Sequence, residues 1–169
     1  SLLRDRAAPH LAFALGRAML DLYPPHFCCV ALDRSPQALE QVLTACLHGA
    51  GLPVMGDTAA YDPIAREVFG RMQPAAREQL RSIARRLVEP GRSLDVGRWM
   101  RAVELTGYRA GFLLCGDLRV AGQVISQEMA PLGTGKWISP RDKIKELVVY
   151  GISEDYFAAR RAIGLDVGA

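Results

Sequence analysis

Hydrophobic residues recur along most of this chain at the three- and four-residue spacing of amphipathic helices. The clearest case is a predicted central helix that starts near residue 94 or 95 and ends at Cys115. Prolines, glycines and capping residues separate further predicted helices at about residues 5–22, 36–48, 63–70, 74–88, 117–128, 140–150 and 154–164. The pattern predicts a mainly α fold: one compact domain over residues 1–169, with about eight helices around a buried central helix and little or no strand.

One short apolar segment, residues 26–32, does not follow this pattern. It comes directly after Tyr23-Pro24-Pro25, which we expect to end the first helix. Its length and composition are compatible with a strand or with an extended connector, and both alternatives stay open.

The central helix contains two features that need a physical reason. Gly107 and Gly111 lie four residues apart, and each glycine costs a helix about 1 kcal/mol relative to alanine. We therefore expect both glycines to allow close packing of a second helix. Glu104 and Tyr108 share the same spacing, and a carboxylate on a buried helix needs a partner.

The composition of the chain makes some functional classes less favoured than others. Half of the residues are hydrophobic and 23% are charged, which is typical of globular proteins. A net charge of +3 with no basic block does not favour nucleic acid as a partner, and no apolar run approaches the roughly 18 residues of a membrane span. The four cysteines form no CxxC pair, which predicts buried free thiols in a reducing, cytoplasmic compartment. The chain starts without Met, and we expect it to be excised from a longer protein.

Three groups of residues are candidates for chemistry. Gly133-Thr-Gly135-Lys136 lacks the spacing of a phosphate-binding loop, and we expect no cofactor. The histidines could join neighbouring cysteines in a zinc site, although their spacing is not diagnostic; they are His10, His26 and His48. A predicted helix carries an arginine stripe that is either a solvated face or a binding surface, with candidate interaction residues Arg77, Arg81 and Arg85.

Two stretches together resemble the gluzincin metallopeptidases. Phe13-Ala-Leu-Gly-Arg17 has the frame of their zinc-binding helix, His-Glu-Leu-Gly-His, and Glu104 to Gly111 resembles their second helix, Glu-x-x-Ala-Asp-x-x-Gly. The resemblance implies that Phe13 and Arg17 replace two zinc-binding histidines, that Ala14 replaces the catalytic base, and that Tyr108 replaces an acid that orients a ligand. Only Glu104 remains of the metal ligands. The resemblance therefore implies a catalytically dead relative with no bound metal.

The same resemblance leads to a structural hypothesis. In the metallopeptidases the two helices face each other across the metal, so we expect an ion pair between Arg17 and Glu104 in its place. The alternative is that Glu104 faces Arg101, Arg109 or solvent.

The chain is also similar to the carboxy-terminal region of long bacterial tetratricopeptide-repeat proteins. The similarity includes Glu104 to Gly111 with the following Gly-Asp turn, the segment from Lys143 to Asp155, and the final Tyr156 to Gly164. It implies a repeat array upstream and a role in protein assembly.

These observations lead to one main hypothesis and two alternatives. The main one is a non-catalytic protein-interaction or scaffold module with an unknown protein partner, no membrane contact, and adaptable loops at residues 51–62 and 130–139. The first alternative is an active enzyme: a zinc hydrolase with atypical ligands, using Glu104 with His10, His26 and His48, or a thiol enzyme. The second is a nucleic-acid or small-ligand binder that uses the arginine face.

Overall fold

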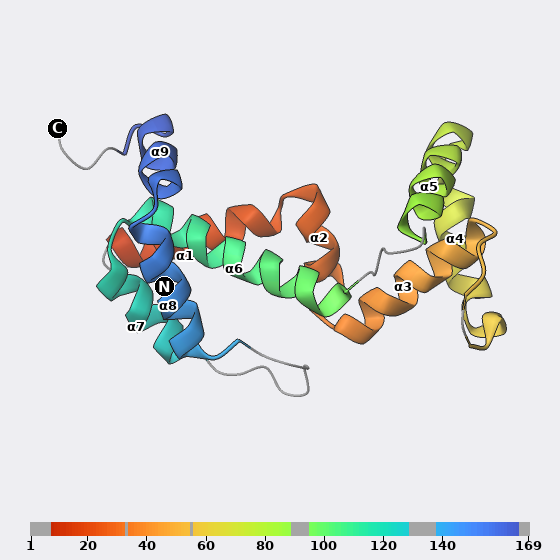
Figure 1. Ribbon diagram of the computed structural model, residues 1–169, viewed down its shortest axis with the longest axis horizontal. Coiled ribbons are helices and arrows are strands. Elements are labelled where there is room, and N and C mark those ends of the chain that lie inside the picture. Colours follow the sequence, from red (N-terminus) through yellow and green to blue (C-terminus); the bar gives the residue numbers. More distant parts are fainter. Residues whose placement is uncertain (1–7, 33, 55, 89–94, 129–137, 166–169) are drawn as a thin grey trace. The chain divides into compact units, whose positions relative to one another are not determined.

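The computed structural model of the chain describes residues 8–32, 34–54, 56–88, 95–128 and 138–165. Within these ranges the chain forms nine α-helices and one short 3-10 helix and contains no strand, which confirms the predicted mainly α fold (Figure 1). Each described helix is too short or too polar to cross a lipid bilayer. The sequence predicts one domain over residues 1–169, and the structure divides this range into two compact units, which are described separately below.

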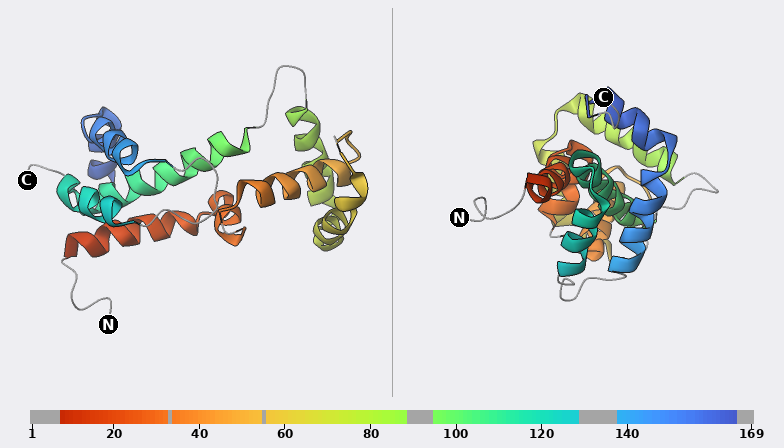
Figure 2. Two further views of the ribbon diagram at one scale, coloured as in Figure 1. Left: turned by 90° about the horizontal axis from the view of Figure 1, so that it is seen from below. Right: turned by 90° about the vertical axis from the view of Figure 1, so that its left-hand side faces the viewer.

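Unit 1 is formed by the two ends of the chain, residues 1–34 and 98–169. Its helices are α1 (Ala8–Asp21), α2 (Pro24–Ala31), α6 (Val96–Cys115, except its first two residues), α7 (Leu118–Gln127), α8 (Pro140–Gly151) and α9 (Glu154–Ala162). α1 packs against α2 and α7, and α8 packs against α7 and α9. The long helix α6 runs beside α1 (Figure 2). Unit 2 is the continuous segment between these two parts, residues 35–97.

The segment at residues 26–32, for which the sequence allowed a strand or an extended connector, is mostly helical, because α2 covers Pro24–Ala31. Neither the strand nor the extended connector is correct. The two prolines end α1 as predicted, but they also occupy the first positions of α2. The backbone N–H groups of the first helical turn have no partner within the helix, so proline loses no helical hydrogen bond there.

Aromatic and aliphatic side chains from five helices form the core of unit 1. Its buried members are Phe13, Tyr108, Phe112, Ala121, Ile125, Leu147 and Tyr156. The rings of Phe112 on α6 and Tyr156 on α9 stack with their centroids 4.9 Å apart and their planes 10° apart. This stack connects the last helix of the chain to α6.

Two glycines allow α1 and α6 to approach closely. A Cβ atom added at Gly16 would lie 2.5 Å from the carbonyl oxygen of Ala110, and one added at Gly111 would lie 2.7 Å from that of Phe13. The packing role predicted for Gly111 is therefore confirmed, and its partner glycine is Gly16. The same role predicted for Gly107 is wrong, because a Cβ atom there would meet no atom within 4 Å.

An arginine on α9 caps the C-terminal end of α6. Gly116 has a φ of +65°, a conformation that glycine adopts without strain, and its N–H donates to the carbonyl of Phe112. The Arg160 guanidinium donates to the carbonyl of Leu113 at 2.8 Å. This contact satisfies one of the carbonyl groups that a helix leaves unpaired at its C-terminus.

Unit 2 has a small core of short side chains. Its helices are α3 (Pro36–Gly49), the 3-10 helix η1 (Thr58–Ala60), α4 (Asp62–Arg71) and α5 (Pro74–Leu87). α3 and α4 pack closely, and α5 also contacts α3. The described buried residues of this unit are Leu39, Ala45, Ala50, Ala65, Ala84 and Val96. A Cβ atom at Gly49 would lie 2.5 Å from the ring of Phe69, so this glycine allows the ring of α4 to pack on α3.

Most of the capping residues that separate the predicted helices form their caps. Ser35, Ser139 and Ser153 each accept a hydrogen bond from the backbone N–H three residues later, at 3.2, 3.1 and 3.3 Å. Asp117 accepts from the N–H groups of two residues at the start of α7. Asp62, which precedes Pro63 and which we also expected to cap the helix that starts there, does not do so, because its carboxylate contacts Nε2 of His48 at 2.7 Å instead.

Candidate functional site

Four of the five residues that the metallopeptidase resemblance singles out meet where α1 faces α6. Tyr108 is 1% exposed, its ring centroid lies 6.4 Å from that of Phe13, and the Arg17 guanidinium carbon lies 4.1 Å from the centre of its ring. Glu104 lies one helical turn before Tyr108, on the same face of α6. The fifth residue, Ala14, is exposed and belongs to no such contact.

A lysine that the sequence did not single out lies at the centre of this site. Lys143, in the first turns of α8, is 1% exposed. Its Nζ atom lies 2.9 Å from Oε1 of Glu104 and 3.3 Å from Oε2 of Glu128. It also donates to the Tyr108 hydroxyl at 2.7 Å and lies 4.5 Å from the centre of that ring. A buried ammonium needs such oxygen atoms, because burial removes its hydration shell.

The Tyr108 hydroxyl connects the lysine to the second carboxylate. It accepts the hydrogen bond from Lys143 and donates its own proton to Glu128. Burial first, and then the hydrogen bond to Glu128, raise the pKa of the Tyr108 hydroxyl far above its usual value. Tyr108 therefore remains a neutral donor at any physiological pH.

The predicted ion pair between Arg17 and Glu104 is not formed, because each of the two residues pairs with a different partner. Arg17 pairs with Glu128, the residue that ends α7, and Glu104 pairs with Lys143. The alternative pairing of Glu104 with Arg109 is not formed either, because Arg109 pairs with Glu146 on α8. The expectation that a buried acid on α6 needs a cation from another helix is correct, and the cation comes from α8 rather than α1.

The resulting group of five residues, called here the Tyr108 cluster, joins four helical elements. Its members are Arg17 (α1), Glu104 and Tyr108 (α6), Glu128 (the C-cap of α7) and Lys143 (α8). Two cations face two carboxylates, so the ionised cluster has no net charge. Each charged member has an opposite charge within contact distance, which offsets the cost of removing it from water. This arrangement fixes the four elements relative to one another.

Helical spacing contained a signal for both missed residues. The buried residues Ala121 and Ile125 of α7 lie four residues apart, and Glu128 comes three residues after Ile125. On α8, Lys143 comes four residues before the buried Leu147. Each charged residue therefore continues the apolar face of its helix into the core. A charged residue in that register is expected to be buried with a partner.

The histidines and cysteines do not form a metal site. Among the described residues, no three His, Cys, Asp or Glu side chains come close enough together to hold a metal ion. This finding contradicts the set of Glu104 with His10, His26 and His48 as zinc ligands, and His48 instead contacts Asp62. All four cysteines are free thiols, and burial raises the pKa of the Cys29 thiol to about 11. Cys29 is thus a poor nucleophile at neutral pH.

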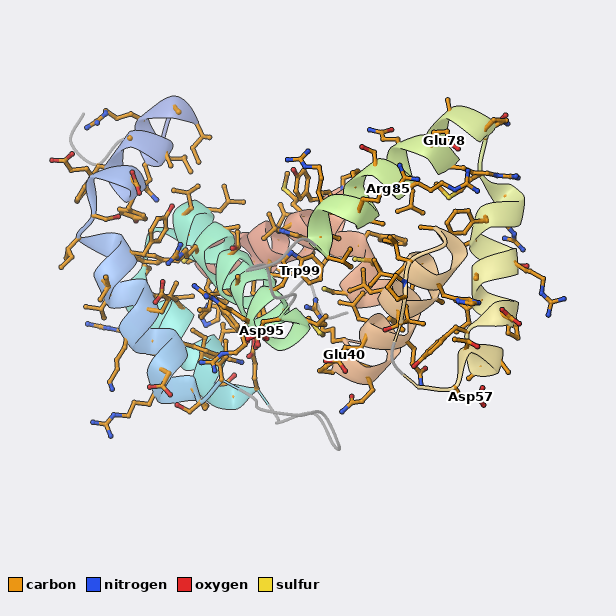
Figure 3. The ribbon with its side chains drawn as sticks, turned by 45° about the vertical axis from the view of Figure 1, so that its right-hand side comes forward. Glu40, Asp57, Glu78, Arg85, Asp95 and Trp99 are labelled. Carbon is orange, nitrogen blue, oxygen red and sulfur yellow. The ribbon has the colours of Figure 1, made fainter. Side chains whose placement is uncertain are left out.

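The arginine face on α5 is partly used within unit 2. Arg77 donates to the carbonyl of Met72 at the end of α4, at 3.0 Å. Arg81 pairs with Glu78 on the same helix. Arg85 is exposed further along α5 (Figure 3). The three candidate residues therefore do not form a uniform row of free cations.

The structure describes most of one of the two loops that we expect to be adaptable and little of the other. The loop at residues 51–62 contains η1, whose first turn is capped by the Asp57 carboxylate at 3.0 Å from the N–H of Ala59. Most of the loop at residues 130–139 lies outside the described residues. The chain matches no protein-family model, no curated protein and no solved structure.

Proposed function

We propose that this chain is a non-catalytic protein-interaction module in which the ammonium of Lys143 takes the place of a lost metal ion. The observation that carries the proposal is the position of Lys143 Nζ, which is buried and lies 2.9 and 3.3 Å from two glutamate carboxylates. One of these, Glu104, is the remaining ligand position of the metallopeptidase resemblance.

The charge balance of the Tyr108 cluster supports a structural role for this cation. With Lys143 and Arg17 present, the two carboxylates are already neutralised. A divalent metal would have to displace the ammonium, and the first helix offers Phe13 and Arg17 where imidazole ligands would be needed. The catalytic base position is occupied by Ala14, which cannot accept a proton.

The interaction half of the proposal is supported by the surface of the first two helices. Large apolar side chains on α1, on α2 and in the turn between them are exposed rather than packed in the core, among them Met19, Leu22 and Phe27. A large exposed apolar surface is typical of protein-interaction sites. We place the module at the carboxy-terminal end of a bacterial repeat protein in the cytoplasm, on the sequence resemblance and the free thiols. The upstream coding sequence tests this placement.

A cation-replacement experiment tests the lost-metal half. The chain is purified as wild type, as Lys143→Ala and as Lys145→Ala, which removes an exposed lysine of the same helix. Metal content is measured after zinc loading and dialysis, and the melting temperature is measured with and without millimolar Ca²⁺, Mg²⁺ or Zn²⁺. We expect substoichiometric zinc in the wild type, and a melting temperature that divalent cations raise only in Lys143→Ala.

Stoichiometric zinc in the wild type would overturn this half of the proposal. The interaction half is tested by a photoreactive amino acid at position 19, compared with one at the exposed position 149 on α8, in cells that make the protein. A specific crosslinked species from position 19 alone is the expected result. No crosslink from position 19 would contradict the interaction module.

A further inference from the structure

The outward side of α1 and α2 carries two apolar stripes that meet at the turn between the helices. The first stripe is Leu15, Met19 and Leu22, and the second is Tyr23, Phe27 and Val30, each at intervals of four and three residues. All six side chains are exposed, from 37% at Val30 to 74% at Leu22. These six residues are called here the α1–α2 face.

The two charged residues of the same segment are both ion-paired. Between Ala8 and Leu32 the residues charged at neutral pH are Arg17 and Asp21, and the two histidines, His10 and His26, are counted as neutral. Arg17 pairs with Glu128, and Asp21 accepts from the Arg34 guanidinium at 2.7 Å. Both charges are therefore used inside unit 1, and the exposed residues of the segment are uncharged.

The exposed apolar residues of α8 lie in a different environment. Val149 and Ile152 are 63% and 77% exposed, as much as the members of the α1–α2 face. They lie at the C-terminal end of α8, which carries exposed charges at Arg141 and Lys145, and Glu154 follows them at the start of α9. Apolar exposure alone does not distinguish the α1–α2 face. Its low charge does: over twenty-five consecutive residues, 8–32, the residues charged at neutral pH are Arg17 and Asp21, and both are ion-paired.

The physical character of this face identifies an occupant. An uncharged apolar face can meet an identical face without like-charge repulsion, and most soluble homo-oligomers pair such surfaces about a two-fold axis. Six large side chains that are each one third to three quarters exposed offer on the order of 600 Å² per copy, so a pair would bury about 1,200 Å², within the range of specific interfaces.

We propose that two copies of this chain associate through the α1–α2 face to form a dimer. This inference rests on the proposed protein-interaction function and names the partner as a second copy of the chain. Tyr23 and Phe27 would lie near the centre of the interface, where aromatic residues contribute most to association.

Sedimentation velocity of the full chain over a range of concentrations tests the proposal. The wild type is expected at twice the chain mass of 18.5 kDa at tens of micromolar. Met19→Asp and Leu22→Lys, which place opposite charges on the face, are both expected at the mass of one chain, with dissociation constants raised at least 100-fold. The matched controls Val149→Asp and Ile152→Lys are expected to remain dimeric. Because all four positions are exposed, circular dichroism should show unchanged helix content.

Three results would overturn the dimer. They are a wild type that is monomeric at several hundred micromolar, a dimer that persists in both Met19→Asp and Leu22→Lys, and a dimer that only the α8 variants dissociate. The photocrosslinks separate the two proposals. A monomeric wild type whose position 19 crosslinks to a different protein ends the dimer proposal and leaves the interaction module standing. A monomeric wild type with no crosslink ends both.

Discussion

Unit 1 buries the ammonium of Lys143 among carboxylate and hydroxyl oxygens, whereas the described buried residues of unit 2 are leucine, valine and alanine. Apolar side chains can pack in many nearly equivalent ways. A buried charge is tolerated only in an arrangement that supplies its partners, so it selects one arrangement of the helices. The comparison indicates that unit 1 is specified by a few polar contacts between distant segments, and unit 2 by close packing of small residues.

Removal of Lys143 should have the largest effect. We expect Lys143→Met to lower the free energy of unfolding of unit 1 by about 3–5 kcal/mol, because it leaves the largely buried carboxylate of Glu104 without its cation. Hydrogen exchange of peptides from α6 and α8 measures this loss, and peptides from α3 and α4 serve as an internal reference. Lys145→Met, on the exposed side of α8, is the matched control and should change protection by less than about 0.5 kcal/mol.

A second substitution sharpens this result. Glu104→Gln added to Lys143→Met removes the uncompensated charge and leaves the pair of Arg17 and Glu128 intact. The double variant should therefore be more stable than Lys143→Met alone. If the double variant were less stable than the single one, the buried charge would not be the cause of the loss.

Gly107 and Gly111 of α6 should respond to alanine with opposite signs. Gly111→Ala would place a Cβ atom 2.7 Å from the Phe13 carbonyl oxygen, and we expect a loss of about 1–3 kcal/mol as α1 is pushed away. Gly107→Ala meets no neighbour within 4 Å and should stabilise the helix by up to about 1 kcal/mol. Thermal unfolding of the two variants measures both changes. Equal changes in stability would contradict the finding that α1 approaches α6 closely at Gly111 and not at Gly107.

Local signals predicted the helices of this fold because their causes lie within a few residues. Ser35, Ser139 and Ser153 cap helices through bonds to N–H groups three residues away, and the apolar spacing fixes the face that each helix buries. The same reasoning failed at α2, where Pro24 and Pro25 were interpreted only as the end of a helix. Proline is equally compatible with the start of the next helix.

The partners within the Tyr108 cluster could not be predicted in the same way. The sequence indicates that Glu104 needs a cation, but Lys143 lies thirty-nine residues away and Arg17 eighty-seven residues away, and spacing alone does not choose between them. The resemblance to a two-helix metal site placed Phe13, Arg17 and Tyr108 correctly near one another. It contains no information on α7 and α8, which supply Glu128 and Lys143.

Removal of the Tyr108 hydroxyl tests whether the cluster acts as a network. Tyr108→Phe keeps the ring in the core but removes the acceptor for Lys143 and the donor to Glu128. We expect a loss of about 1–3 kcal/mol in unit 1, because the buried ammonium of Lys143 and the partly buried carboxylate of Glu128 each lose a partner. Tyr150→Phe is the control, since that ring is only partly buried at the edge of the same core. Chemical unfolding should show the larger loss for Tyr108→Phe.

The smallest effect should come from the polar contact of unit 2. His48 and Asp62 connect α3 to the start of α4 at 2.7 Å, but the Asp62 side chain is 56% exposed. Water already solvates such a group, so Asp62→Asn should change the free energy of unfolding by no more than about 1 kcal/mol. Exchange of α3 and α4 peptides in wild type and variant measures the change, with Asp57→Asn as a second exposed control. A loss comparable to that of Lys143→Met would mean that unit 2 also depends on a specific polar contact, and the contrast between the two units would fail.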